Sequence, residues 1–93
     1  MIEREAGRLI VKAPLVMDNA RALLEAGQAA LQPGEQIFDF SQVREADSSA
    51  VAIMLGWQRA AARLRSTVRF AHIPVGVRSL AELYGVADLL PLA

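Results

Sequence analysis

The spacing of the apolar residues changes along this chain, and these changes restrict the folds that it can adopt. Residues 2–5 and 8–12 read as two short extended segments around Ala6-Gly7, and apolar and charged side chains alternate in the second. This pattern predicts a small β-hairpin whose second strand ends before Pro14. From Val16 onward, apolar residues recur every three or four positions, as they do on one face of a helix.

The first predicted helix begins after Asp18 or Asn19, because either side chain can accept a hydrogen bond from the first turn. Pro33-Gly34 ends this helix. Its inward-facing residues are expected to be Ala20, Leu23, Leu24, Gly27 and Leu31. The next segment, residues 36–40, is short and contains β-prone aromatic residues, which predicts a strand. A polar loop, residues 41–46, follows this strand.

The longest predicted helix follows three consecutive residues that can cap a helix, Asp47, Ser48 and Ser49. Capping the free N–H groups of the first turn is worth about 1 kcal/mol. The apolar residues of the helix recur at three, four and seven positions and form one continuous face. This face consists of Ala50, Ile53, Met54, Trp57, Ala61 and Leu64.

The last part of the chain adds one strand and two helical segments. Residues 67–71 are β-prone and form the predicted strand. A helix at 75–84 follows, and Gly85 is well placed to end it in the left-handed conformation. The side chains of this helix that should face inward are Leu80 and Leu83. A final helical turn is expected at 86–90.

The predicted order of elements is β-β-α-β-α-β-α-α. Strands that are separated by helices pair in parallel through right-handed crossovers. The fold class is therefore expected to be α/β, with a mixed, mostly parallel sheet of four to five strands and helices mainly on one face. No linker or repeat interrupts the pattern, so residues 1–93 are expected to form a single domain.

Composition excludes several classes of function. Ten lysines and arginines balance ten aspartates and glutamates, whereas a nucleic-acid-binding domain of this size would carry a basic surplus. Residues 1–5 contain no basic or apolar region typical of a signal peptide. No apolar run approaches the ~20 residues that span a bilayer, so direct membrane insertion is not expected. Together with the lack of cysteine, these features predict a cytoplasmic protein.

The sequence contains the residue types of a catalytic triad but not its motif. Ser48 or Ser49, His72, and Asp39 or Asp47 could supply a nucleophile, a base and an orienting carboxylate. The G-x-S-x-G turn that exposes a nucleophile is missing. One histidine and no cysteine provide no metal site, and the scattered glycines form no phosphate-binding loop. We therefore expect no enzymatic activity, no metal and no cofactor.

Two interpretations of the segment Asp47-Ser48-Ser49 remain open at this point. In the structural interpretation, these residues only cap the long helix. In the functional one, an exposed hydroxyl at the positive end of the helix dipole is phosphorylated or hydrogen-bonds a partner.

Residues 38–50 resemble the STAS domain of sulphate transporters and anti-sigma factor antagonists. In that family a strand ends in Asp-Leu/Phe-Ser, a loop of about six residues follows, and Asp-Ser/Thr-Ser/Ala-Gly opens a helix. The residues that match this pattern are Asp39, Ser41, Asp47, Ser48 and Ser49. Ala50 replaces the usual glycine, so the helix start is expected to be less open. The resemblance implies the STAS fold over essentially the whole chain.

Residues 52–61 and 73–90 resemble more narrowly the small STAS subunit of the maintenance-of-lipid-asymmetry (Mla) transporter of Gram-negative bacteria. Trp57 and the ending that contains Leu83-Tyr84-Gly85-Val86 carry this resemblance. It implies a non-catalytic subunit that binds the ATPase subunit of an ABC phospholipid transporter, in a complex with its permease. The protein would then lie at the cytoplasmic side of the inner membrane, attached through its partner, and would help to maintain outer-membrane lipid asymmetry.

The resemblance places Ser48 at the ATPase contact, and the expected partner-binding residues are Asp47, Ser48, Ser49, Ala52, Gly56 and Tyr84. Small residues in a helix let another surface approach, but they also occur at tolerant exposed sites. Tyr84 could simply end a helix, and Trp57 is expected to pack in the core. The alternative function is an anti-sigma factor antagonist. In that case phosphorylation of Ser48 would add about −1.5 to −2 charge and break the complex with the partner.

Overall fold

The computed structural model describes residues 1–91 and begins with the hairpin that the sequence predicts. Strands β1 (Ile2–Glu5) and β2 (Arg8–Val11) pair antiparallel. The turn between them needs two residues in the left-handed conformation, and Ala6 and Gly7 have φ angles of 51° and 78°. Such a two-residue turn matches the right-handed twist of the strands it connects.

The sheet continues through two parallel strands, as predicted. Strand β3 (Gly34–Asp39) pairs with β2, and β4 (Ser66–Ala71) pairs with β3, which gives the order β1-β2-β3-β4. The short helix η1 (Met17–Asn19) and helix α1 (Ala20–Ala30) connect β2 to β3. Helix α2 (Ser49–Arg63) connects β3 to β4. The α/β fold with a mixed, mostly parallel sheet is therefore confirmed, with four strands.

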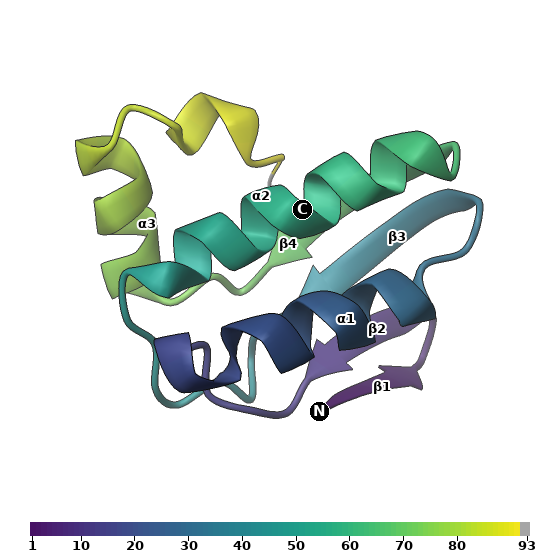
Figure 1. Ribbon diagram of the computed structural model, residues 1–93, viewed down its shortest axis with the longest axis horizontal. Coiled ribbons are helices and arrows are strands. Elements are labelled where there is room, and N and C mark those ends of the chain that lie inside the picture. Colours follow the sequence, from purple (N-terminus) through teal and green to yellow (C-terminus); the bar gives the residue numbers. More distant parts are fainter. Residues whose placement is uncertain (92–93) are drawn as a thin grey trace.

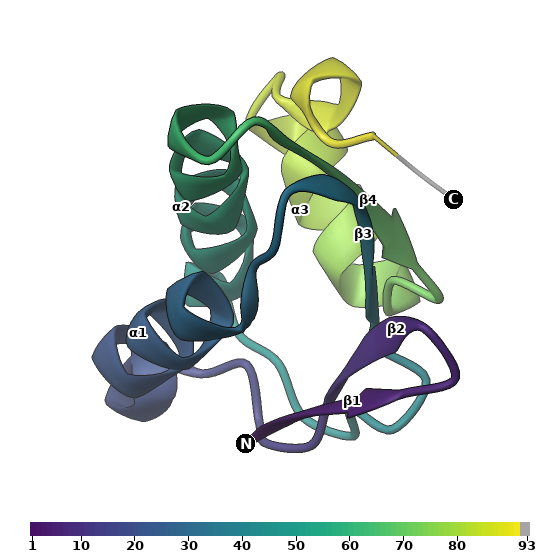
Figure 2. The same ribbon diagram turned by 90° about the vertical axis from the view of Figure 1, so that its right-hand side faces the viewer.

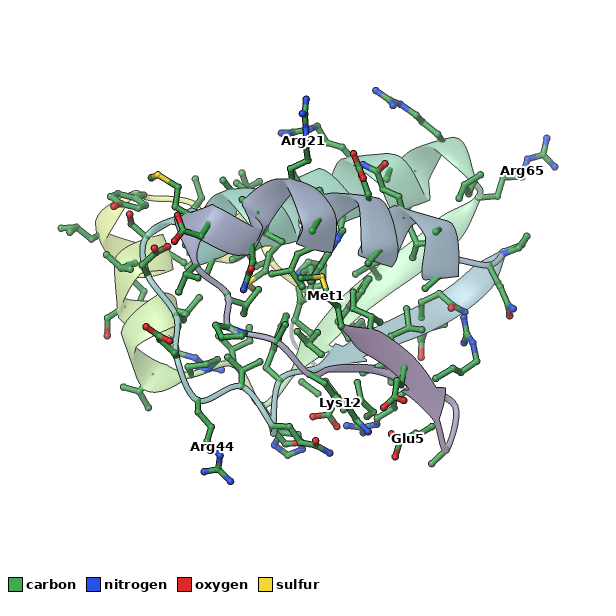
Figure 3. The ribbon with its side chains drawn as sticks, turned by 60° about the horizontal axis from the view of Figure 1, so that its bottom comes forward. Met1, Glu5, Lys12, Arg21, Arg44 and Arg65 are labelled. Carbon is green, nitrogen blue, oxygen red and sulfur yellow. The ribbon has the colours of Figure 1, made fainter. Side chains whose placement is uncertain are left out.

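Helices α1 and α2 run side by side along one face of the sheet (Figures 1 and 2). Helix α3 (Val75–Leu83) lies at the end of the sheet to which the parallel strands point, and η2 (Ala87–Leu89) follows it (Figure 1). Helix α2 thus lies between α1 on one side and α3 with η2 on the other. The opposite face of the sheet carries ion pairs, among them Lys12 with Glu5 at 2.6 Å (Figure 3).

The core is built around Trp57, which is fully buried in α2, as the apolar spacing predicts. Its ring stacks on Phe38 with 4.2 Å between ring centroids and 3° between ring planes. The indole N–H donates to the carbonyl oxygen of Leu23 in α1 at 3.0 Å. The indole reaches the backbone of α1 because Gly27 has no side chain there, and a Cβ atom at Gly27 would lie within 2.6 Å of three ring atoms.

Two predicted core positions are wrong. Leu64 is 44% exposed because α2 ends at Arg63, so the helical spacing does not extend to it. Leu83 is 78% exposed. Helix α3 buries Val77 and Ala81, and a residue two positions after Ala81 points to the opposite side of a helix.

The helix ends also differ partly from the prediction. Asn19 makes no side-chain cap to α1, because its amide nitrogen donates to the carbonyl oxygen of Pro14 at 3.1 Å. Gly85 does end α3 in the left-handed conformation, with φ 72°. The N–H groups of Gly85 and Val86 bond back to the carbonyl oxygens of Glu82 and Ala81, respectively, which is a Schellman motif.

Candidate functional site

The start of α2 is fixed in place by a link between two loops. Leu15, which follows β2, forms an isolated parallel bridge with Ala46, which precedes α2. The N–H of Leu15 donates to Glu45, and the N–H of Asp47 donates to the carbonyl oxygen of Leu15. Leu15 is itself fully buried. The segment that carries the expected site is therefore anchored to the core.

Asp47 holds together the starts of α1 and α2. Its Oδ1 accepts hydrogen bonds from the N–H of Ser49, at 2.8 Å, and from the Ser49 hydroxyl. Its Oδ2 accepts one from the N–H of Met17 at 3.0 Å. These bonds stabilise the carboxylate and lower the pKa of Asp47, with the Ser49 hydroxyl as the largest cause. Asp47 therefore has a structural role that the sequence pattern only partly indicates.

Ser48 lies between these bonded residues and is exposed. Its backbone is already helical, with φ −62° and ψ −19°, and its side chain does not cap the helix. Within residues 1–91 its hydroxyl has no hydrogen-bond partner. Of the three candidate caps, Asp47 provides the cap and Ser48 does not. Its hydroxyl is free to contact another molecule.

Asp39 and Ser41 shape the loop before this site. Asp39 Oδ1 accepts the N–H of Ser41 at 2.8 Å, and Oδ2 accepts Arg8 at 3.1 Å. Burial alone would raise the pKa of Asp39, but the hydrogen bonds from Ser41 and Arg8 outweigh it and lower the pKa. The buried Asp39 therefore stabilises the end of β3 and the turn to the exposed Ser41.

The side of α2 that faces away from the core carries one row of residues, which we call the outer stripe. Its members recur at alternating steps of four and three, and each is exposed or only partly buried. They are Ser48, Ala52, Leu55, Arg59 and Ala62. Alternating steps of four and three keep side chains on one face of a helix, the spacing that a second helix recognises in a coiled coil.

Gly56 lies beside the outer stripe but already has a neighbour within the protein. It is partly buried, and a Cβ atom at this position would overlap Cδ2 of Leu24 in α1. The close approach that Gly56 permits is therefore between α1 and α2. Ala52 is exposed, and it belongs neither to the apolar core nor to the residues that pack against the core.

The end of α3 and the short helix η1 expose apolar side chains. Tyr84 is 53% exposed, and the adjacent Leu83 is more exposed still. Met17, which the sequence interpretation did not single out, is 70% exposed. Its backbone bonds to Asp47, so it lies next to the start of α2. The sequence did contain a signal for Met17, because it is an apolar residue that precedes α1 and lies outside the buried face of that helix.

The residues that could supply a catalytic triad are not arranged as one, because the Ser49 hydroxyl donates directly to Asp47. Asp39 and Asp47 accept backbone N–H groups and, respectively, Arg8 and the Ser49 hydroxyl. Among the hydrogen bonds of residues 1–91, none joins His72 to a serine or to an aspartate. The same part of the chain contains no cluster of three metal-ligating side chains. Within it, no helix has the length and apolar character needed to cross a bilayer.

The model of the family described as "Mlab, STAS domain" matches residues 2–91. Among solved structures, the anti-sigma factor antagonist SpoIIAA in its unphosphorylated form superimposes with a TM-score of 0.71 and 16% sequence identity. The alignment covers 100% of this chain and 86% of SpoIIAA. An anti-sigma-factor antagonist (STAS) domain protein from Planctomyces limnophilus gives a TM-score of 0.68 at 18% identity, covering 99% of this chain and 86% of that one. A search of curated proteins found no match.

Proposed function

Because this chain belongs to the MlaB-like STAS family, we propose that it is a non-catalytic accessory subunit that docks onto the ATPase subunit of an ABC phospholipid transporter. The observation that carries the proposal is the exposed Ser48 at the start of α2, with a hydroxyl that the described chain does not use. The start of α2 is held in place and presents a small polar side chain whose hydroxyl has no partner in the described chain. Such a surface suits a contact that forms without rearrangement.

The docking surface in this proposal is the first part of the outer stripe, Ser48 and Ala52, together with its neighbours at the helix start. Ser48 and Ala52 have small side chains, so a partner helix can approach the backbone of α2 closely. Met17 supplies exposed apolar area beside them, and Tyr84 provides an aromatic contact at the end of α3. Aromatic side chains contribute strongly at protein interfaces. Asp47 and Ser49 act indirectly, because they hold the helix start in position.

The absence of catalysis is part of the proposal and is supported by the hydrogen bonds of the site. The carboxylate adjacent to Ser48, that of Asp47, already accepts two backbone N–H groups and the Ser49 hydroxyl, so it is not available as a base for the Ser48 hydroxyl. The subunit would act by stabilising one arrangement of the ATPase. Its location at the inner membrane, with the permease, would follow from that contact. Its role in outer-membrane lipid asymmetry would follow from the transporter.

A specific observation also favours a second candidate function, an anti-sigma factor antagonist. The Ser48 hydroxyl is accessible and its backbone lies at a helix N-terminus, where a phosphate group is electrostatically favoured. In that function a kinase would add phosphate to Ser48, and the added charge would release the partner.

The two functions are separated by the identity of the partner. We expect affinity purification of the tagged protein, from the cells that encode it, to recover an ABC ATPase and its permease. Mass spectrometry identifies the bound proteins. Recovery of a small serine kinase or a sigma-factor regulator instead, with phosphate on Ser48, would replace the transporter proposal with the antagonist.

A further inference from the structure

A shallow hollow lies on the surface between the second half of α2 and η2. Its volume is about 360 Å³, and it is lined by Leu55, Gln58, Arg59, Ala62 and Leu89. Three of these residues belong to the outer stripe. Helical rise places Arg59 roughly 16 Å along α2 from Ser48, so the hollow is separate from the docking surface at the helix start.

The charged residue that lines this hollow is Arg59, and the acidic Asp88 precedes the lining residue Leu89 in η2. Helix α2 contains Arg59 and Arg63 but no acidic residue, and the exposed Arg65 follows it. Arg65 projects away from the body of the protein (Figure 3). Within residues 1–91 none of these three arginines forms an ion pair, whereas the basic residues that do, Arg8, Lys12 and Arg69, lie on the sheet. The chain as a whole is neutral, so this excess of positive charge is local.

Gln58, which lines the hollow, has one buried polar atom without a partner among residues 1–91. The Oε1 atom of Gln58 is enclosed and has no hydrogen-bond partner in the described chain. Leaving a buried acceptor without a partner is unfavourable, and rotation of the terminal amide would exchange the positions of its oxygen and nitrogen. Because Oε1 is buried, a partner in the hollow can bond to it only after such a rotation.

From these three features we infer that the hollow is a second contact for the partner, and that it receives a segment carrying an aliphatic side chain beside a carboxylate. The aliphatic side chain packs against Leu55 and Leu89, and the carboxylate pairs with Arg59. This inference rests on the proposed function, because it takes the ATPase subunit as the partner. It extends the docking surface over the whole outer stripe.

A protein segment fits the hollow better than a membrane surface does. A helix that binds a bilayer inserts its apolar face, but the apolar face of α2 is buried against the sheet around Trp57. The hollow is concave and is lined on one side by Leu89, which is 55% exposed. A shaped side chain can fill such a depression, whereas a lipid headgroup layer cannot follow its contour.

The test measures the affinity of purified variants for the ATPase subunit encoded by the same genome. We expect Arg59→Glu to weaken binding about tenfold or more, and Arg59→Lys to retain most of it, because charge is the main requirement. Higher salt should weaken the wild type more than Arg59→Gln. The matched control is Arg69→Glu, which makes the same charge change on the opposite face of the sheet and should leave affinity unchanged.

A second variant separates binding from folding. Gln58→Met keeps the side-chain length and removes the unpaired amide, so the melting temperature should stay the same or rise. The same variant should lose affinity for the ATPase subunit several-fold, since the hydrogen bond to the partner is lost. A role of Gln58 in the fold alone would produce the opposite result, a lower melting temperature with unchanged affinity.

The outcomes distinguish this inference from the proposed function. Wild-type binding that Arg59→Glu leaves unchanged would overturn the inference while the proposed function stands. A wild-type protein that binds no ATPase subunit would overturn both. A third result would also overturn the inference. If the wild type bound vesicles of phosphatidylglycerol and phosphatidylethanolamine and Arg59→Glu did not, while the two proteins had equal affinity for the ATPase subunit, the hollow would be assigned to a lipid surface instead.

Discussion

The contact between Gly27 and Trp57 allows a quantitative prediction about stability. Replacing Gly27 with alanine would place a Cβ atom within 2.6 Å of three atoms of the indole ring. The ring cannot move aside easily, because it is fully buried, stacks on Phe38 and donates to the carbonyl oxygen of Leu23. Either α1 must shift away from α2 or the indole must leave its hydrogen bond.

The expected size of the effect follows from three contributions. Overpacking a rigid core costs about 3 kcal/mol at the upper end of its usual range. Loss of the indole hydrogen bond costs about 1 kcal/mol more. Alanine gains about 1 kcal/mol over glycine in helix propensity. Gly27→Ala should therefore lower the free energy of unfolding by about 3 kcal/mol, which corresponds to at least 10 °C in melting temperature for about 90 residues.

Urea denaturation followed by far-ultraviolet circular dichroism and by tryptophan fluorescence measures this change, because Trp57 is the single tryptophan of the chain. Gly76→Ala is the matched control. It makes the same substitution in α3, where nothing lies within 4 Å of the added Cβ atom, so the protein should become slightly more stable. If Gly27→Ala proved as stable as the wild type, the proposed packing of α1 against Trp57 would be wrong.

Three further predictions concern the helix contact, acid stability and the site. Gly56→Ala should destabilise by only about 1 kcal/mol, measured by the same denaturation, because the overlapping atom is the end of the flexible Leu24 side chain. The pKa values of Asp39 and Asp47 are lower in the folded protein, so stability should be constant well above the unfolded value of about 3.9 and decrease as the pH falls through it. Asp47→Asn should flatten this decrease in acid titrations of stability. Ser48→Glu should leave the melting temperature within a few degrees of the wild type, since an exposed carboxylate is tolerated at a helix N-terminus.

The parts of the fold that local spacing determines were predictable. The hairpin and the buried face of α2 follow from alternation and helical periodicity, which act within a few residues. Leu83 was assigned to the core because its spacing from Leu80 fits a helix, but the position of α3 relative to the sheet decides which side is buried. The contact of Gly27 with Trp57 joins residues 30 positions apart, and glycine alone carries no sign of its partner.

The site was predictable in position but less so in its internal contacts. Three adjacent residues could each cap α2, and sequence does not reveal which one is held in reach of the free N–H groups. The bridge of Leu15 to Ala46 decides this in favour of Asp47 and leaves Ser48 exposed. Gly56 illustrates a second limit. A small residue on a helix has the same appearance in a sequence whether the neighbouring surface is α1 or another protein.

The measurement that tests the central claim most directly is the affinity of Ser48 variants for the ATPase subunit. The account predicts that the wild type binds and that Ser48→Glu does not, while both remain folded. Ser48→Gln, which adds similar size without charge, should retain partial binding. Equal affinity of Ser48→Glu and the wild type would contradict the account, because the account requires that a charge at this position of the docking surface is not tolerated.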